Sequence, residues 1–400
     1  MSRPSIHTID EAASSTHGSA RALIWLLAIG AGVGVANVYY IQPVLPLVRE
    51  TFRADAEHAS FVPALTQAGY AAGMLLLAPL GDLVDRKRLI VAKALVLAIA
   101  LVTSAIAPSL QLLTLTGVVV GLLGSVGQDF VPVAAHLAAD EQRGRTVGIV
   151  TTGLLTGILL SRTLGGIVGD LFGWRAIYWL AAGMVALVGG AVWQVLPSFP
   201  PTTSGTYRDL LRSLVTLTKQ HPALRKAIVT QALLAISLGA FWSTLALTLA
   251  EPPFRLGAGT AGAFGLAGAA GAFGAPLFGH IADRRGPDIA IRFGCSLVIL
   301  SFGAMVLLPG LLAVLVTGAI LFDLGVMAGL VSHQAIVNAI DPMARSRLNG
   351  LLMSAAMIGM ALGAALGGWA WSHQGWTGVC LVGAGAGAAA LLRSLLPPSK

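Results

Sequence analysis

Long apolar runs, broken by short polar or charged segments, fill nearly the whole chain after residue 20. The runs are continuous and do not alternate with polar residues, so they predict membrane-spanning helices and not the strands of a membrane β-barrel. A helix needs about 20 residues to cross the hydrocarbon core. Twelve runs meet this length: 22–47, 60–81, 89–107, 110–138, 146–169, 174–197, 224–250, 259–282, 288–309, 311–339, 348–371 and 375–396.

The composition agrees with this pattern. Of the 400 residues, 56% are apolar and only 10% are charged, against about 25% charged in soluble domains. This excludes a soluble enzyme, a disordered chain and a disulfide scaffold. The net charge of +8 comes from short loops, so we expect a lipid bilayer and not nucleic acid as the partner. The sequence carries no nucleotide-binding Gly-Lys-Ser/Thr loop, metal-ligand cluster or nucleophile–base set, and we expect neither enzymatic activity nor a cofactor.

Lysine and arginine predict the orientation. If the N-terminus is inside, 20 of them fall on the cytoplasmic side, 4 on the outer side, and Arg162 falls inside a span. Both termini are therefore expected in the cytoplasm. The chain divides into a disordered tail (1–20), a six-helix half (21–197), a cytoplasmic linker (198–223) and a second six-helix half (224–400). In the linker, Tyr207 to Gln220 has its leucines on one face, which predicts a helix lying on the membrane surface.

The two halves repeat one another. The segment Ala78-Pro79-Leu80-Gly81-Asp82-Leu83-Val84-Asp85-Arg86 recurs, with one inserted residue, as Ala275-Pro276-Leu277-Phe278-Gly279-His280-Ile281-Ala282-Asp283-Arg284. Six further residues recur at an offset of 202: Arg143, Arg145, Gly148, Gly157, Gly173 and Trp174. Paired six-helix repeats are typical of transporters that bind substrate near the midplane, between the halves, and rock to give alternating access.

These residues carry a family resemblance that extends over the whole chain after residue 20. The loop from Gly81 to Arg88 is similar to the loop 2–3 motif of the major facilitator superfamily, and the second copy falls in loop 8–9. The resemblance implies the major facilitator fold, with twelve helices in two six-helix repeats. It also implies a cytoplasmic latch between the halves. The gating residues that it assigns are Gly81, Asp82, Asp85, Arg86, Arg88, Asp283 and Arg284.

The fifth span resembles the motif of drug:proton antiporters. Its glycines stand at Gly148, Gly157, Gly165 and Gly166, but Ser161-Arg162 replaces the usual Gly-Pro pair. The run from Ala36 to Pro46 is similar to a little-studied branch of exporters in the same superfamily. The departure at Ser161-Arg162 leaves open whether the antiporter mechanism is kept.

Three ionisable residues fall inside spans, where charge is costly and therefore a sign of function. Arg162 and Asp323 lie at similar depth, roughly 25 and 27 Å from the inner helix ends at about 1.5 Å per residue. We expect them to pair across the halves in one state and to part in another, with proton coupling through Asp323. Asp129 is the other proton-coupling candidate. The alternatives are a structural ion pair or outer-interface position for Arg162, a shallow outer position for Asp323 and a structural hydrogen bond for Asp129.

In the family that the chain resembles, spans 1, 4, 7 and 10 line the substrate cavity. Aromatic rings with a few convergent polar groups suit amphipathic ligands. The substrate-binding candidates are Asn37, Tyr39, Tyr40, Gln42, Gln128, Arg162, Gln231, Trp242, His333 and Gln334.

Together these features predict a monomeric secondary transporter of the bacterial inner membrane that exports small amphipathic molecules in exchange for protons. Uptake of an organic anion with protons is an alternative, which Arg162 favours. A membrane sensor that binds a ligand without transporting it is another, although the chain has no sizeable soluble domain to signal through.

Overall fold

A computed structural model describes residues 6–201, 205–268, 284, 286–341 and 344–397, with side chains from residue 21 onward. Within these ranges every regular element is a helix. The elements are α1 (Ile6–Ala36), α2 (Ile41–Phe52), α3 (Ala56–Ala72), η1 (Gly73–Leu77), η2 (Ala78–Asp82), α4 (Arg86–Ala105), α5 (Leu110–Gly124), α6 (Val126–Leu137), η3 (Asp140–Gln142), α7 (Arg143–Phe172), α8 (Trp174–Val195), α9 (Tyr207–Gln220), α10 (Pro222–Ala250), α12 (Pro287–Leu307), α13 (Leu312–Ile340) and α14 (Arg345–Leu395).

Ten helical stretches of the described chain are long and apolar enough to cross a membrane. One of them, α14, has 51 residues and a non-helical backbone at Gly375 (φ 59°, ψ −148°). At about 1.5 Å per residue it would measure roughly 75 Å, far more than one crossing, so it holds both the eleventh and the twelfth spans. The eighth predicted span is described only at its start, where residues 258–268 are helical. The all-helical membrane fold is confirmed.

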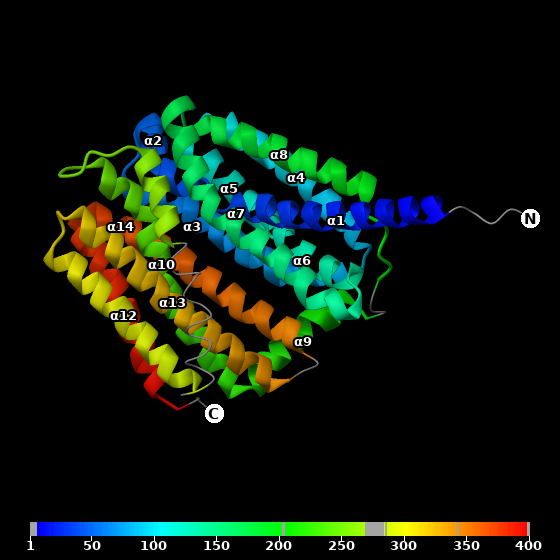
Figure 1. Cartoon of the computed structure of the whole chain (residues 1–400). Coiled ribbons are helices and arrows are strands. Elements are labelled where there is room, and N and C mark those ends of the chain that lie inside the picture. Colours follow the sequence, from blue (N-terminus) through cyan, green and yellow to red (C-terminus); the bar gives the residue numbers. More distant parts are fainter. Residues whose placement is uncertain (1–5, 202–204, 269–283, 285, 342–343, 398–400) are drawn as a thin grey trace, which may run out of the picture.

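The helices form two groups that follow the sequence halves (Figure 1). Helices α1 to α8, from blue to green, make one group, and α10 to α14, from green to red, make the other. One contact recurs in both groups. Arg143 Nε donates to Ala135 O at 3.1 Å, and Arg345 Nε donates to Asn338 O at 3.1 Å. Each bond ties the end of one span to the start of the next, so the sequence repeat is also a structural one.

The first half contains interrupted helices. Span 1 breaks into a turn at Asn37–Tyr40, between α1 and α2. The Asn37 side-chain amide donates to Val33 O (2.7 Å) and Gly34 O (3.1 Å), carbonyls that the break releases. Span 4 breaks at Ser125, between α5 and α6. The Ser125 hydroxyl donates to Leu122 O. Broken helices occur inside membranes where side chains satisfy the freed backbone groups.

On the side that the charge bias makes the outer one, the two halves touch. Two glycines, one from each half, allow this. A Cβ on Gly166 of α7 would overlap Ala258 O, and a Cβ on Gly368 of α14 would overlap the side chain of Ser60. The missing Cβ at these two positions lets helices of the two halves approach closely. The outer ends are further joined by Arg49 Nη1 to Glu251 Oε1 (3.3 Å).

Three features differ from the sequence-based expectations. Helix α1 begins at Ile6, so residues 6–20, expected in a disordered tail, are helical. Lys93, counted with the cytoplasmic charges, is 4% exposed and lies inside α4. Helix α9 has the predicted bounds and a Thr206–Asp209 capping box, but its apolar face does not rest on the membrane surface. Instead Leu217 is buried in a cluster with residues of the second half.

Candidate functional site

A cavity of about 360 Å³ lies between the two halves, toward the inner face. The first half contributes the irregular end of span 2 (η1 and η2) and the side chains of Gln128 and Asp129. The second half contributes the start of α14, including Arg347 and Asn349. Irregular turns such as the π-turn at η1 concentrate at functional sites. The cavity therefore has the position expected for a compartment that opens to one side in alternating access.

Helix α9 closes part of this cavity. Leu210 and Leu214 line it, and the Tyr207 hydroxyl donates to Leu76 O of the first half at 2.8 Å. Because Leu217 is buried against the second half, the helix bridges the inner ends of both halves. The leucine stripe that suggested a membrane-surface helix thus faces protein.

Asp129 is already paired within the first half. Lys93 Nζ lies 2.6 Å from Asp129 Oδ2, and the two side chains are 4% and 7% exposed. The sequence analysis missed Lys93, although its position two turns into an apolar helix was a signal. A buried ion pair satisfies both charges, whereas removal of one partner leaves an uncompensated charge. The pair therefore fixes α4 against α6 at the wall of the cavity.

Arg162 lies at the contact between the halves, held by aromatic rings from both. Its guanidinium carbon is 4.9 Å from the ring centre of Tyr39 and 4.2 Å from that of Trp242. Its Nε donates to Gln42 Oε1 at 2.8 Å. Tyr39 lies in the break of span 1 and Gln42 follows it at the start of α2, and both side chains lie toward α7. A cation stacked on aromatic faces gains about 2 kcal/mol or more when it is desolvated.

Asp323 belongs to the same cluster. Its Oδ1 accepts a hydrogen bond from Trp242 Nε1 at 3.4 Å. Among the described residues no ion pair joins Arg162 directly to Asp323, but their charges attract one another. Arg162 lies ten residues from the end of α7 and Asp323 eleven from the start of α13, each roughly 15 Å from the outer end. The predicted match in depth therefore holds, with Trp242 contacting both partners.

Small residues make room for this cluster. A Cβ on Gly265 would lie 3.1 Å from Arg162 Cβ, and a Cβ on Gly268 would lie 2.9 Å from Asp323 Oδ2. The start of the eighth span thus passes close to both charged residues. Asp170 fixes that start, because its carboxylate accepts the backbone N–H groups of Ala258 (2.8 Å) and Gly259 (2.7 Å).

The other predicted binding residues do not converge on Arg162. Gln128 lines the inner cavity and donates to Tyr70 Oη at 2.9 Å. Gln231 Oε1 lies 3.0 Å from His333 Nδ1 inside the second half, and Gln334 lies beside Met353. The two remaining candidates serve elsewhere: Asn37 satisfies the backbone of α1, and Tyr40 lines a groove on the outside of the bundle.

The loop 2–3 residues form a local network. Arg86 Nη2 donates to Asp82 Oδ1 at 2.5 Å. Asp85 caps α4 by accepting from Lys87 N (2.9 Å) and also accepts from Phe199 N (3.2 Å). Burial alone would raise the pKa of Asp85, but the N–H groups of Phe199 and Lys87 outweigh it and lower the pKa below its usual range. This cap is lost only as the pH falls through that lowered value.

The remaining loop residues are less informative. Arg88 Nε is 4.0 Å from Asp85 Oδ2. Arg284 is exposed, and Asp283 lies outside the described residues. Within the described ranges no group of three or more His, Cys, Asp or Glu side chains could hold a metal ion.

Comparisons with known proteins agree with this geometry. The chain is 38% identical to the uncharacterized transporter YgaY of Escherichia coli O157:H7, over 92% of this chain and 93% of that protein. It is 25% identical to the multidrug resistance protein MdtG of Proteus mirabilis, over 69% and 70% of the two chains. Its fold matches a crystal structure of a mutant of the nucleoside transporter NupG, with a TM-score of 0.78, 14% identity and coverage of 93% and 99%.

A sequence model of the Major Facilitator Superfamily matches residues 27–341. That range includes the broken first span, the loop 2–3 network and both charged residues at the contact between the halves. The chain is therefore a transporter that belongs to the Major Facilitator Superfamily.

Proposed function

We propose that the protein exports small amphipathic compounds across the bacterial inner membrane in exchange for protons, as a monomer with both termini in the cytoplasm. The observation that carries the proposal is the cluster of Arg162, Trp242 and Asp323. It spans both halves at mid-depth and contains one carboxyl that can take up a proton. The similarity to a multidrug resistance protein supports export of amphipathic compounds.

Coupling follows from the charge of the cluster. With Asp323 ionised, Arg162 and Asp323 together carry no net charge. A proton on Asp323 leaves a net positive charge in a largely desolvated site and weakens the bond from Trp242. Isolated charge is costly in a low-dielectric interior. The two protonation states therefore favour different separations of the halves, as proton-driven alternating access requires.

Substrate enters from the inner side in this proposal. The inner cavity offers apolar walls from α9 and polar groups from Gln128 and Arg347. The outer ends are closed by the Gly166 and Gly368 contacts, so an amphipathic molecule in the cavity meets the Arg162 cluster as the barrier to release.

The test uses everted vesicles that contain the full chain, with an acidified lumen and a pH-sensitive dye. Addition of a transported amphiphile should release luminal protons, and Asp323→Asn should abolish the release. Glu141→Gln, an exposed carboxyl at the inner end of α7, is the matched control and should leave release unchanged. Undiminished proton release in Asp323→Asn would refute the proposed coupling.

A second candidate function, uptake of an organic anion with protons, is supported by Arg162 itself. The cluster places the guanidinium of Arg162 between two aromatic rings, and its Nε donates to Gln42. This arrangement suits a ligand with a carboxylate attached to an apolar body. In right-side-out vesicles with an inward proton gradient, accumulation of a labelled aromatic carboxylate would favour this function over export.

A further inference from the structure

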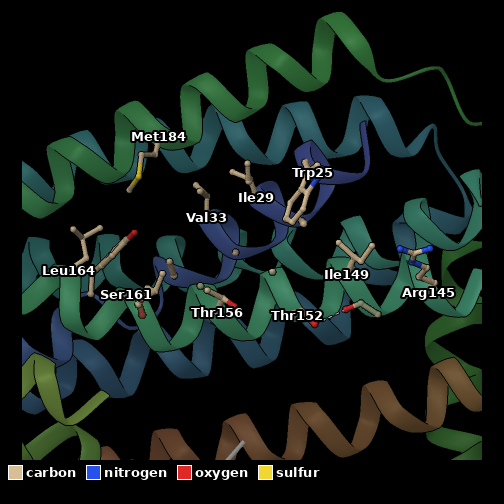
Figure 2. Close-up of a pocket in the computed structure, with 18 residues that line it drawn as sticks. Trp25, Ile29, Val33, Arg145, Ile149, Thr152, Thr156, Ser161, Leu164 and Met184 are labelled. Carbon is tan, nitrogen blue, oxygen red and sulfur yellow. Dashed lines mark hydrogen bonds between the residues drawn. The ribbon is translucent and has the colours of Figure 1, made fainter. Parts of the chain in front are cut away.

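A second cavity lies on the outside of the bundle, away from the cluster of Arg162. It is a groove of about 660 Å³ between α1, α7 and α8. Trp25, Ile29 and Val33 of α1 and Met184 of α8 line it, with Trp25 and Met184 toward opposite ends, and α7 forms the side opposite α8 (Figure 2). Trp25 and Ile29 are 57% and 55% exposed. Since these apolar side chains belong to membrane-spanning helices, the groove opens toward lipid.

The floor of the groove is formed by close contacts between α1 and α7. A Cβ on Gly153 would overlap Ala28 O, and a Cβ on Gly157 would overlap Gly32 O. The backbones of α1 and α7 are thus in direct contact along the floor. At these two positions the contact separates the groove from the interior between the halves, so we do not assign the groove to the transported compound.

The inner end of the groove is positively charged. Arg145 lines it at the same end as Trp25 (Figure 2). Arg145 is exposed, and no hydrogen bond or ion pair within the described chain holds its guanidinium, whereas its neighbour Arg143 is paired with Asp140 at 2.6 Å. Arg21 precedes Trp25 by four residues and therefore lies on the same face of α1, one turn nearer the inner end.

The length of the groove fits one lipid chain. Its lining on α7 runs from Arg145 to Leu164, roughly 28 Å at 1.5 Å per residue. Half of the hydrocarbon core is about 15 Å deep, so an acyl chain of the inner leaflet can lie entirely within the groove while its phosphate stays at the arginines. Basic pockets between spans on the cytoplasmic side bind anionic lipid headgroups.

We propose that this groove binds an anionic phospholipid of the inner leaflet, with its phosphate on Arg145 and Arg21 and one acyl chain between α1, α7 and α8. The lipid chain fills the space between α8 and the contact of α1 with α7. The site needs no transported substrate, and it stands whether or not the export proposed above is correct.

Trp25 provides the readout. The purified full chain is mixed with phosphatidylglycerol or phosphatidylcholine brominated on the acyl chain, and quenching of Trp25 is obtained as the difference from Trp25→Phe. Brominated phosphatidylglycerol should quench Trp25 at lower concentration than phosphatidylcholine. Arg145→Gln should reduce that preference about fivefold, and Arg292→Gln, an exposed arginine on α12, should not change it.

A second variant tests the groove itself. Thr156 is exposed and lines the groove, so Thr156→Phe should reduce quenching by both lipids. Leu187 of α8 is 75% exposed and lies outside the lining of the groove, so Leu187→Phe should not reduce it. Equal quenching by the two lipids in the unchanged protein would overturn the proposal, as would an undiminished preference in Arg145→Gln. Displacement of the brominated lipid by an uncharged amphiphile as readily in Arg145→Gln as in the unchanged chain would also overturn it.

Discussion

The two halves share a backbone frame but divide the chemistry unequally. The glycine pair Gly165-Gly166 of α7 recurs 202 residues later as Gly367-Gly368 of α14, and both pairs make close contacts at the outer side. At the same offset, however, Ala364 stands in place of Arg162. At the offset of 198 that pairs Asp85-Arg86 with Asp283-Arg284, Ile291 stands in place of Lys93. The packing that holds the halves together is thus repeated, while most of the buried charge belongs to the first half.

The backbone differs in the same direction. Spans 1 and 4 are broken at Asn37–Tyr40 and at Ser125, whereas their counterparts α10 and α13 run unbroken for 29 residues each. A break frees carbonyl and N–H groups and re-aims the side chains beside it. The first half therefore presents Tyr39 and Gln42 from beside a break, whereas the second half supplies Trp242 and Asp323 from unbroken helices.

The largest effect is expected at the ion pair that the second half lacks. Lys93→Met leaves Asp129 buried without its partner and should destabilise the protein by about 3–5 kcal/mol. Thermal unfolding in detergent measures this. The double variant Lys93→Met with Asp129→Leu should recover most of the loss, because neither charge remains. Ile291→Val, at the buried neutral counterpart, should cost only about 0.5–1.5 kcal/mol. An equal cost would show that burial and not charge matters here.

The next effect concerns Arg162 and its neutral counterpart. Arg162→Ala removes two ring contacts and the bond to Gln42, about 2 kcal/mol in total, and should slow transport about thirtyfold in the vesicle assay. Arg162→Lys keeps the charge but loses the planar fork, so we expect partial activity. Ala364→Ser should be without effect. Full activity of Arg162→Lys would show that the stacked geometry is unnecessary.

The repeated glycine contacts should respond alike. Gly166→Ala places a methyl group against the backbone of Ala258, and Gly368→Ala places one against the side chain of Ser60. Overpacking of this kind costs about 1–3 kcal/mol. Because the contacts exist in the outer-closed state, both variants should shift the population toward an open outer side. Arg53 follows α2 and Leu308 follows α12, both on the outer side. The distance between spin labels at these two positions should therefore increase.

Matched glycines provide the controls for that measurement. A Cβ added to Gly183 or Gly385 would have no atom of another residue within 4 Å beyond its own stretch of helix, so alanine there should leave the label distance unchanged. A shift in Gly166→Ala without one in Gly368→Ala would show that the repeated contacts do not share the closure equally.

The smallest effect is expected at the surface pair between the halves. Arg49 and Glu251 are 33% and 49% exposed, and exposed ion pairs contribute about 0.2–1 kcal/mol. Glu251→Gln should therefore change the label distance only slightly, and less so at high salt. A shift as large as that in Gly166→Ala would mean that charge and not close packing closes the outer side.

Much of the fold could be predicted from the sequence. Continuous apolar runs indicated the spans, and the recurrence of Asp85-Arg86 as Asp283-Arg284 indicated the repeat. The bounds of α9 also followed from its leucine spacing. The breaks in spans 1 and 4 could not be placed from the sequence, because no proline stands at Asn37–Tyr40 or Ser125. The side chains of Asn37 and Ser125 also bond to the nearby backbone locally. The surface that covers α9 was likewise hidden, since a leucine stripe fits lipid and protein equally.

Several residues of the candidate site were predicted from the sequence, but the contacts between them were not. Depth along the helix placed Arg162 and Asp323 at one level, but distance along a helix says nothing of what stands between two helices, and the structure puts Trp242 there. Lys93 was not predicted as a buried residue, because counting charges assigns a residue near a helix end to the loop. Its burial depends on the neighbouring helix that carries Asp129.

The sequence by itself determined that the chain spans a membrane as two related six-helix units. The length of each apolar run and the recurrence of short motifs can both be read directly along the chain, without knowledge of contacts between distant segments. Only the tertiary structure decided which charges meet, which helix faces contact protein instead of lipid, and where the groove beside Arg145 lies. Those features depend on distances between segments far apart in sequence, and close packing sets such distances through contacts that no single segment encodes.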